Sequence, residues 1–306
     1  MKLTFCCTDT RPEPWLTALA AALPEAQVSL WAPGAPLADV AVVWAPPQRF
    51  VDEQVGLKAL FNIGAGVDDL LKLDLPPGLM VVRLDDAGMA VQMAEYVTQA
   101  VVRCFRDLPT YAQAQTEARW AFQKPRERAG FVVGLMGLGV LGGRVAQALR
   151  HFDFPVRAWS RTPKQSPGVD TYAGAGGLAP FLAGTQVLVN LLPLTPDTRD
   201  ILNRDTLGLL PPGAHVVNVA RGAHLVDDDL LALLDNGHLA SATLDVFRVE
   251  PLPDTHPFWK HPKITVTPHM SARTLRDDSV AQIASKVRAL AQGLPIAGVV
   301  DPSRGY

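Results

Sequence analysis

The chain has 306 residues, a formal net charge of −2, and 48% hydrophobic and 19% charged residues. That length predicts two domains, and the composition is ordinary for a soluble globular protein. Nucleic acid is not an expected partner, because binding phosphates requires clustered Lys and Arg and the chain has no basic block. Cys6, Cys7 and Cys104 form neither a disulfide framework nor a paired metal motif. No metal site, secretory signal or membrane span is predicted, and we expect a cytoplasmic protein.

The first part of the chain alternates short apolar strands with a helix. The predicted strands are 2–7, 28–31, 40–44, 59–63 and 80–84, and the predicted helix is 13–23. From residue 92 to about residue 122, apolar residues recur at three- and four-residue spacing, which is typical of a helix. Residues 124–128, with Pro125 between charges, are predicted to be a surface linker.

A second series of strands and helices follows. Its predicted strands are 131–136, 156–159, 187–191, 215–218, 241–245 and 264–266. The clearest helix is 227–236, which has acidic residues in its first turn and Gly237 as its C-cap. A final amphipathic helix is predicted over 275–292. Strands alternating with helices indicate parallel sheets in both halves.

A glycine motif of the form G-x-G-x-x-G follows the strand 131–136. Its residues are Gly137, Leu138, Gly139, Val140, Leu141 and Gly142. The first glycine permits a tight turn, the second lets a pyrophosphate approach the backbone, and the third lets the following helix pack on the strand. A strand before the motif and a helix after it supply the context that the pattern needs, so we expect a bound dinucleotide.

The residues after the next strand bear on the choice between NAD and NADP. Proteins that bind NAD place Asp or Glu there, to hold the ribose 2′-hydroxyl. This chain has Ser160, Arg161 and Thr162, with Lys164 nearby. Arginine can bind a 2′-phosphate through charge-assisted hydrogen bonds, whereas an acid would repel it. The sequence therefore favours NADPH and leaves NADH possible.

Three polar residues suit the reduction of a keto acid. Arg221 and His269 each follow a predicted strand, and Glu250 lies between them in the sequence. The reaction needs a cation for the substrate carboxylate and a proton for the carbonyl oxygen, and histidine titrates near neutral pH. A glutamate beside it would favour its protonated form. Each residue alone is more often structural, so the argument depends on their joint occurrence.

The chain resembles the D-isomer-specific 2-hydroxyacid dehydrogenases, and within that family it is most similar to the branch that reduces glyoxylate and hydroxypyruvate. The matching segments, besides the glycine motif, are Val43-Trp44, Ile63-Gly64-Ala65-Gly66-Val67-Asp68, Gly88-Met89, Gln92-Met93-Ala94-Glu95-Tyr96, Trp159-Ser160-Arg161-Thr162, Asn190-Leu191-Leu192-Pro193, Asn218-Val219-Ala220-Arg221-Gly222, Leu244-Asp245-Val246-Phe247, Glu250-Pro251-Leu252-Pro253, Thr267-Pro268-His269 and Arg304-Gly305-Tyr306. They span nearly the whole chain.

The resemblance implies a role for each matching position. His269 would donate the proton, Glu250 would orient it, and Arg221 would bind the substrate carboxylate and polarise the keto oxygen. The other expected substrate-binding residues are Trp44, Ala65, Gly66 and Met89, with the backbone of Ala65 and Gly66 holding the carboxylate. The expected cofactor-binding residues are Gly137, Gly139, Val140, Leu141, Gly142, Ser160, Arg161, Thr162, Leu192, Pro193, Ala220 and Asp245, the last at the nicotinamide carboxamide.

The resemblance also implies an architecture of two doubly wound parallel-sheet α/β domains with a cleft between them. Residues 1–95 and 281–306 would form a flavodoxin-like substrate-binding domain. Residues 96–280 would form a Rossmann-type domain for the dinucleotide. Members of the family usually form dimers through the cofactor domain, so a homodimer is expected.

Two alternatives to an NADPH-dependent glyoxylate and hydroxypyruvate reductase stay open. One is a dehydrogenase of the same family that acts on a larger 2-keto acid, or on a small anion such as formate or phosphite. The other is a binding protein that senses the dinucleotide without turnover. Trp44 favours a small substrate if it lines the pocket. The presence of Arg221, Glu250 and His269 together argues against the sensor.

Overall fold

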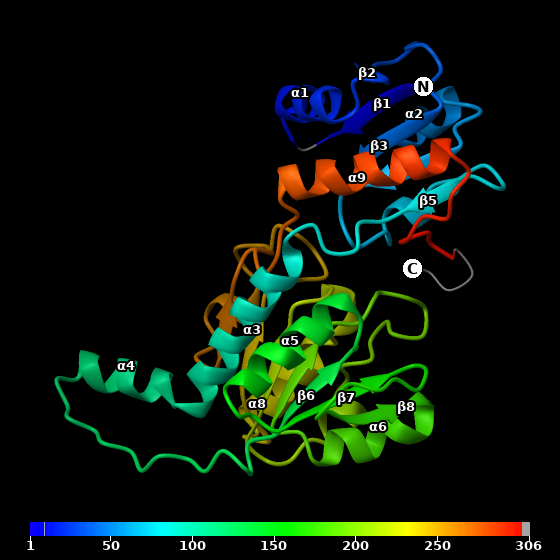
Figure 1. Cartoon of the computed structure of the whole chain (residues 1–306). Coiled ribbons are helices and arrows are strands. Elements are labelled where there is room, and N and C mark those ends of the chain that lie inside the picture. Colours follow the sequence, from blue (N-terminus) through cyan, green and yellow to red (C-terminus); the bar gives the residue numbers. More distant parts are fainter. Residues whose placement is uncertain (9, 302–306) are drawn as a thin grey trace. The chain divides into compact units, whose positions relative to one another are not determined.

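The computed structural model describes residues 1–8 and 10–301. They form two compact units: unit 1 contains Met1–Met89 and the chain from Arg273 onward, and unit 2 contains Ala90–Ala272. Each unit is a parallel β-sheet with helices packed on it (Figure 1), so the expected fold class of two α/β domains is confirmed. The segment Arg304-Gly305-Tyr306, which contributed to the family resemblance, lies outside the described residues.

The boundaries between the units lie after Met89 and after Ala272. They are six and eight residues earlier than the expected boundaries, after residues 95 and 280. Met93 and Ala94 pack in the core of unit 2 with later residues of their helix, so the helix groups with that unit from Ala90 onward. Val280 packs in the core of unit 1. A helix is assigned to a unit by the core that its apolar face joins, and the two helices concerned begin before the expected boundaries.

Unit 1 contains five strands and its own helices. Its elements are β1 (Lys2–Cys7), α1 (Pro12–Ala22), β2 (Gln27–Leu30), β3 (Val40–Trp44), α2 (Gln48–Glu53), β4 (Ala59–Asn62), the 3-10 helix η1 (Leu70–Lys72), β5 (Met80–Val82) and α9 (Arg276–Ala291). The strand order is β2-β1-β3-β4-β5, which is the flavodoxin-like order. Helices α1 and α9 cover one face of this sheet, and α2 covers the other.

Unit 2 contains seven parallel strands. Its elements are α3 (Met89–Phe105), α4 (Leu108–Thr116), β6 (Val133–Met136), α5 (Val140–His151), β7 (Val156–Ser160), β8 (Asp170–Ala173), α6 (Gly174–Ala183), β9 (Val187–Asn190), α7 (Arg204–Leu207), β10 (Ala214–Asn218), η2 (Gly222–His224), α8 (Asp227–Asp235), β11 (Leu239–Leu244), η3 (Pro257–Trp259) and β12 (Ile264–Val266). The order β12-β11-β10-β9-β6-β7-β8 reverses direction between β6 and β9. Ligands of doubly wound sheets bind at such a switch point, beyond the carboxyl ends of the strands.

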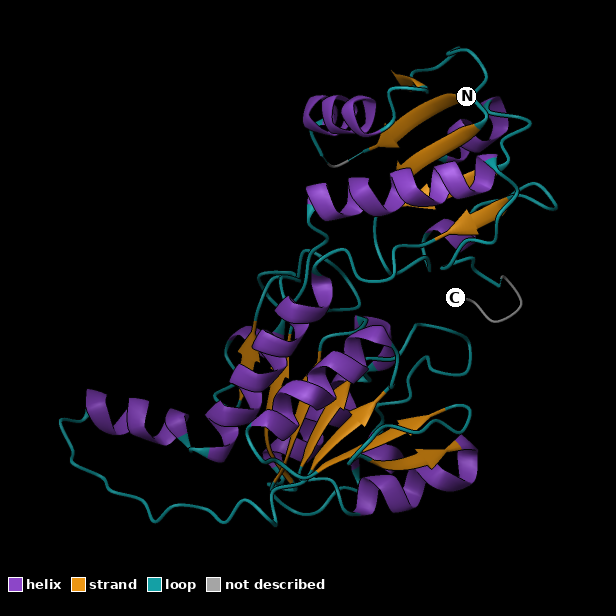
Figure 2. Cartoon of the chain, in the orientation of Figure 1, coloured by secondary structure: helices purple, strands orange, loops and turns teal. Residues whose placement is uncertain are grey.

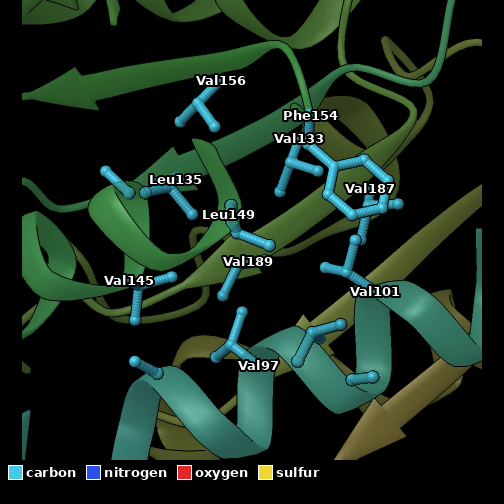
Figure 3. Close-up of a cluster of buried hydrophobic side chains, with 14 of the residues drawn as sticks. Val97, Val101, Val133, Leu135, Val145, Leu149, Phe154, Val156, Val187 and Val189 are labelled. Carbon is cyan, nitrogen blue, oxygen red and sulfur yellow. The ribbon is translucent and has the colours of Figure 1, made fainter. Parts of the chain in front are cut away.

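Both faces of the sheet in unit 2 are buried under helices (Figure 2). Figure 3 shows one face, where apolar side chains of α3 and α5 meet those of β6, β7 and β9; the labelled residues are Val97, Val101, Val133, Leu135, Val145, Leu149, Phe154, Val156, Val187 and Val189. Helices α6, α7 and α8 cover the other face. Adjacent residues of β10, Val216 and Val217, point into opposite cores. Burial on both faces explains why the central strands are continuous apolar runs.

The expected helix from residue 92 to about residue 122 is two helices in the structure. Asp107 has a left-handed backbone, with φ 54°, and Pro109 lies in the first turn of the next helix. Because Asp tolerates this conformation and Pro cannot continue a helix, the chain changes direction there. Helix α4 and the segment after it extend away from the rest of unit 2 (Figure 1). Among residues 1–8 and 10–301, no helix is long and apolar enough to span a membrane.

Candidate active site

The glycine motif forms the turn between β6 and α5. Gly137 has φ 105°, and its N–H donates to the carbonyl of Trp159 at 2.8 Å. A Cβ on Gly142 would lie 2.1 Å from the carbonyl oxygen of Gly137, so the turn itself requires glycine there. Gly139 is different, since a Cβ on it would meet no protein atom within 4 Å and its φ of −88° suits any residue. The packing of the fold does not explain this glycine, whereas a phosphate group approaching the backbone does.

The N-terminus of α5 suits an anion for a second reason. Gly139 is the N-cap and supplies no side-chain acceptor, and the first turn contains no acidic residue. The first N–H groups of a helix have no partner within the helix, and the helix dipole adds positive potential. The residues present therefore fit the pyrophosphate of a dinucleotide.

The loop that follows β7 carries basic side chains, and one of them reaches the glycine turn. Ser160 ends β7, and its hydroxyl donates to the carbonyl of Thr162 at 2.8 Å, which shapes the following loop. Arg161 is exposed. The Nζ of Lys164 donates to the carbonyl of Leu138 at 3.0 Å, so a second positive charge reaches back to the glycine motif. Loops that carry positive charges suit a cofactor with a phosphate on its ribose.

Asp245, which follows β11, is fully buried and holds the loop after β12. Its carboxylate accepts the N–H of Met270 at 2.9 Å and of Ser271 at 2.8 Å. It also accepts the hydroxyl of Thr267 at 2.6 Å, and Thr267 in turn lies 2.6 Å from the hydroxyl of Tyr96 on α3. Burial raises the pKa of Tyr96 to about 12, so this hydroxyl stays protonated and donates. The network fixes the segment that carries His269.

His269 and Glu250 form a hydrogen-bonded pair. The Nδ1 of His269 lies 2.7 Å from Oε2 of Glu250, while Oε1 accepts the N–H of Phe247 at 2.8 Å. Partial burial raises the pKa of Glu250, but these two hydrogen bonds and the charges of His269 and Arg221 outweigh it, so the net pKa shift is downward. His269 has φ 50°, a left-handed conformation in which non-glycine residues are uncommon and which often marks functional sites. Both side chains are partly exposed.

Arg221 lies close enough to Glu250 for its charge to lower the pKa of that carboxyl. Its Nη1 donates to the carbonyl of Ala220 at 2.7 Å. The next residue, Gly222, packs so tightly that a Cβ would lie 1.8 Å from the carbonyl carbon of Phe247. Glycine at this position therefore lets the Arg221 loop approach the segment whose backbone holds Glu250.

Apart from Arg221, which lies in unit 2, the expected substrate-binding residues belong to unit 1. Trp44 ends β3, and its ring covers Gly64, where a Cβ would lie 2.3 Å from a ring carbon. The buried amide of Asn62 donates to the carbonyls of Gly64 at 3.0 Å and Gly66 at 2.8 Å. In a planar trans peptide the N–H points opposite to the carbonyl, so the N–H of Ala65 points away from Asn62. Met89 is buried at the end of the unit, and Ala65 and Gly66 are half-buried.

The residues expected to bind the cofactor and to act in catalysis thus lie at the carboxyl ends of the strands of unit 2, and Glu250 is paired with His269. The sequence analysis gave no role to several residues that shape these loops and the loop after β4. They are Asn62, Tyr96, Gly222 and the buried side chains of Asn190, Asn218 and His224. Within the described part of the chain, no three His, Cys, Asp or Glu residues group as metal ligands.

A doubly wound sheet, a glycine turn with space over Gly139, and the Arg221, Glu250 and His269 group together define a dinucleotide-dependent dehydrogenase. The model of the family described as "D-isomer specific 2-hydroxyacid dehydrogenase, NAD binding domain" matches residues 98–271. The chain belongs to the D-isomer-specific 2-hydroxyacid dehydrogenase family, as its sequence indicated.

Curated relatives match along the whole chain. The glyoxylate/hydroxypyruvate reductase A of Serratia proteamaculans is 49% identical over 100% of both chains. The protein of the same name from Yersinia enterocolitica is 46% identical, again over 100% of both chains. The similarity therefore includes unit 1 as well as the segment that the family model matches.

Solved structures agree with the fold. A D-isomer-specific 2-hydroxyacid dehydrogenase from Xanthobacter autotrophicus Py2, solved with NADPH and MES, has a TM-score of 0.95 and 41% identity, covering 100% of this chain and 99% of that one. An NADPH-dependent glyoxylate/hydroxypyruvate reductase from Sinorhizobium meliloti, solved with NADP and sulfate, has a TM-score of 0.94 and 35% identity, covering 100% of both chains.

Proposed function

We propose that this chain is an NADPH-dependent reductase of small 2-keto acids, which converts glyoxylate into glycolate and hydroxypyruvate into D-glycerate. The observation that carries the proposal is the pairing of His269 with Glu250 at 2.7 Å, close to Arg221, in a unit whose glycine turn fits a dinucleotide. A proton donor and a cation beside a dinucleotide site are what the reduction of a keto acid requires. The names of the relatives from Serratia and Yersinia support the choice of substrates.

The cofactor assignment is NADPH, with NADH as a weaker second. Arg161, Lys164 and the absence of an acid at the end of β7 favour a ribose phosphate. Two similar structures hold NADPH or NADP. The residues assigned to hold it are Gly137, Gly139, Val140, Leu141, Gly142, Ser160, Arg161, Thr162, Leu192, Pro193, Ala220 and Asp245. When bound, this cofactor supplies the hydride that reduces the carbonyl carbon.

His269 holds the proton for the substrate oxygen. An ionised carboxylate only accepts hydrogen bonds, so the Nδ1–H of His269 donates a hydrogen bond to Glu250. The other ring nitrogen, Nε2, then carries the proton that passes to the carbonyl oxygen. Glu250 fixes the orientation of the ring and stabilises its positive form. The guanidinium of Arg221 binds the substrate carboxylate and draws electron density toward the keto oxygen.

Four of the five residues that we assign to substrate binding lie in unit 1. Ala65 and Gly66 contribute backbone to bind the carboxylate, and the orientation that Asn62 imposes on this loop supports an exposed N–H at Ala65. Trp44 and Met89 are assigned to the wall of the pocket, and the bulk of Trp44 favours small keto acids. We propose that unit 1 is the substrate-binding domain and unit 2 the cofactor-binding domain.

A cytoplasmic homodimer completes the proposal. Trp120 is 99% exposed and Phe122 is 81% exposed, in the segment that extends from unit 2 after α4. Neighbouring exposed aromatic residues are unusual on a monomer and typical of an interface. Analytical ultracentrifugation of the wild type and of Trp120→Ser tests the assembly. A dimer that depends on this segment should dissociate in the variant. A wild-type chain that sediments as a monomer contradicts this part.

The test of the proposed function is a set of initial rates with glyoxylate, hydroxypyruvate, pyruvate, a bulky 2-keto acid, formate and phosphite. The keto acids are measured with NADPH and with NADH, and the two anions with NADP and NAD. We expect glyoxylate and hydroxypyruvate to react fastest, and faster with NADPH. Inertness of both, with turnover of another compound, would mean a different dehydrogenase of this family. Binding of NADPH without any turnover would instead indicate a sensor.

A further inference from the structure

Three buried polar side chains lie beneath the loops that carry Leu192, Pro193 and Arg221. Asn190 ends β9, Asn218 ends β10, and His224 ends η2, and all three are fully buried. Asn190 and Asn218 are also direct neighbours across the two strands. Burying polar groups is unfavourable unless their hydrogen bonds are satisfied, so the partners of these side chains indicate what they hold in place.

His224 is held in one tautomer by its partners. Its Nε2 lies 3.2 Å from the carbonyl oxygen of Pro193, which only accepts, so Nε2 carries the hydrogen. In the neutral ring Nδ1 then accepts, and it lies 3.0 Å from the amide nitrogen of Asn190. His224 therefore connects the backbone of the cofactor loop to the side chain that ends β9.

The hydrogen bonds continue from Asn190 to the loop of Arg221. The amide nitrogen of Asn190 also donates to Oδ1 of Asn218 at 3.0 Å, and its Oδ1 accepts the N–H of Leu192 at 3.2 Å. Asn218 donates to the carbonyl of Arg221 at 3.0 Å. One connected network therefore joins the backbone of Leu192 and Pro193 to the backbone of Arg221.

We propose that His224 is a positioning residue, which sets the Leu192–Pro193 loop and, through Asn190 and Asn218, the Arg221 loop. The inference rests on the proposed function, which assigns the first loop to NADPH and the second to the substrate carboxylate. One buried side chain, that of His224, then controls the affinity for NADPH and the affinity for the substrate, although it contacts neither ligand. Asn190 uses one amide hydrogen for His224 and the other for Asn218. Loss of the acceptor at His224 therefore disturbs both the Leu192–Pro193 loop and the Arg221 loop.

Two variants of the full chain separate the two connections. His224→Leu removes the donor to Pro193 and the acceptor for Asn190. His224→Asn keeps an amide oxygen near the position of Nδ1 but is too short to reach Pro193. The control is His215→Leu, which removes a buried histidine from β10 whose Nδ1 lies 2.7 Å from the hydroxyl of Ser241.

The readouts are the dissociation constant of NADPH without substrate, the KM for hydroxypyruvate at saturating NADPH, and the thermal midpoint. We expect His224→Leu to raise both constants roughly tenfold, by analogy with the loss of about 10- to 100-fold when a residue that orients a metal ligand is removed. His224→Asn raises the dissociation constant of NADPH alone and leaves KM near the wild-type value. His215→Leu lowers the thermal midpoint and changes neither constant.

The inference is overturned if His224→Leu lowers only the thermal midpoint, as the control does. If His224→Leu does not fold, His224→Asn decides alone, and wild-type values of both constants in that variant overturn the inference equally. Failure of the proposed function would be seen differently, in a wild-type chain that does not bind NADPH. That result would contradict the proposed function and, with it, the roles assigned to both loops.

Discussion

The Nδ1 atom of His269 lies 2.7 Å from Oε2 of Glu250, and backbone groups hold both partners. Phe247 donates its N–H to Glu250 at 2.8 Å, and the N–H of His269 donates to the carbonyl of Asp245 at 2.8 Å. Both contacts come from the segment that follows β11. The protein's own backbone therefore fixes the geometry of the pair, which is the property that makes a proton donor effective.

Glu250→Gln tests this pair. We expect kcat/KM to fall roughly 10- to 100-fold while the affinity for NADPH is kept, because a neutral amide orients the ring but stabilises its positive form poorly. The pKa of Glu250 lies below its ordinary value of 4.5. In the wild type Glu250 is therefore ionised above pH 4.5, and it becomes protonated as the pH falls through the lowered pKa. Profiles of kcat/KM from about pH 3 to pH 8 should show this acidic limb only in the wild type.

The control for Glu250→Gln is Glu117→Gln, after α4, whose pKa is also lowered, by hydrogen bonds from Gln113 and Arg119. It should leave the profile unchanged. Identical profiles for the wild type and Glu250→Gln would contradict the role of the pair.

Two alanine substitutions in the glycine turn should behave oppositely. Gly139→Ala adds a Cβ that meets no protein atom within 4 Å, so the thermal midpoint should stay close to the wild-type value while NADPH binding weakens. Gly142→Ala places its Cβ 2.1 Å from a backbone oxygen and should lower the midpoint strongly. Calorimetry and NADPH titration measure both effects. Unchanged NADPH affinity in Gly139→Ala would mean that no phosphate approaches this position.

Arg161→Asp should shift the cofactor preference from NADPH toward NADH. A charge-assisted hydrogen bond to a phosphate is worth about 1.5–3 kcal/mol, so the ratio of kcat/KM for the two cofactors should change by about 10- to 150-fold. Arg106→Asp, at an exposed arginine after α3, controls for the loss of net charge. A wild type that already prefers NADH would refute the assignment of this loop.

His215 should make the stability of unit 2 depend on pH. Burial, with the charge of Arg126, lowers the pKa of this histidine from 6.5 to about 4. Between pH 6.5 and about pH 4, His215 binds a proton in the unfolded chain but not in the folded chain. Its contribution to the free energy of unfolding therefore decreases as the pH falls from 6.5 to about 4, and it is constant below that pH. At pH 5 the contribution is about 2 kcal/mol less than at neutral pH.

Urea unfolding at the two pH values measures this difference in the wild type and in His215→Gln. The variant should lack that part of the pH dependence. If it retains the full dependence, other groups are responsible.

Much of the fold could be predicted because buried parallel strands are apolar runs, and β1, β3 and β12 have the bounds that the sequence indicated. Strand β8 was missed, since it lies at the edge of its sheet and its residues are polar or half-exposed. The break at Asp107 was missed because a left-handed residue leaves the apolar spacing on either side intact. Helix α2 was missed as well, and at six residues it is too short for a clear period.

For the site, sequence motifs located the glycine turn and the segments after the strands, since these depend on local order. The contacts that position the chemistry join distant segments. Gly222 approaches Phe247, and His224 reaches both Pro193 and Asn190. A buried histidine and a glycine have no distinctive pattern in a sequence, so their contacts become evident only in the folded structure.

The most direct test of the account is to compare His269→Gln with the wild type, in the rate of NADPH oxidation by glyoxylate and in NADPH affinity. The account predicts that the rate falls roughly 10²- to 10⁴-fold, the usual contribution of a general acid, while the dissociation constant of NADPH stays within about twofold. A variant that reduces glyoxylate at the wild-type rate would contradict the account, as would a wild type that binds NADPH and reduces no 2-keto acid.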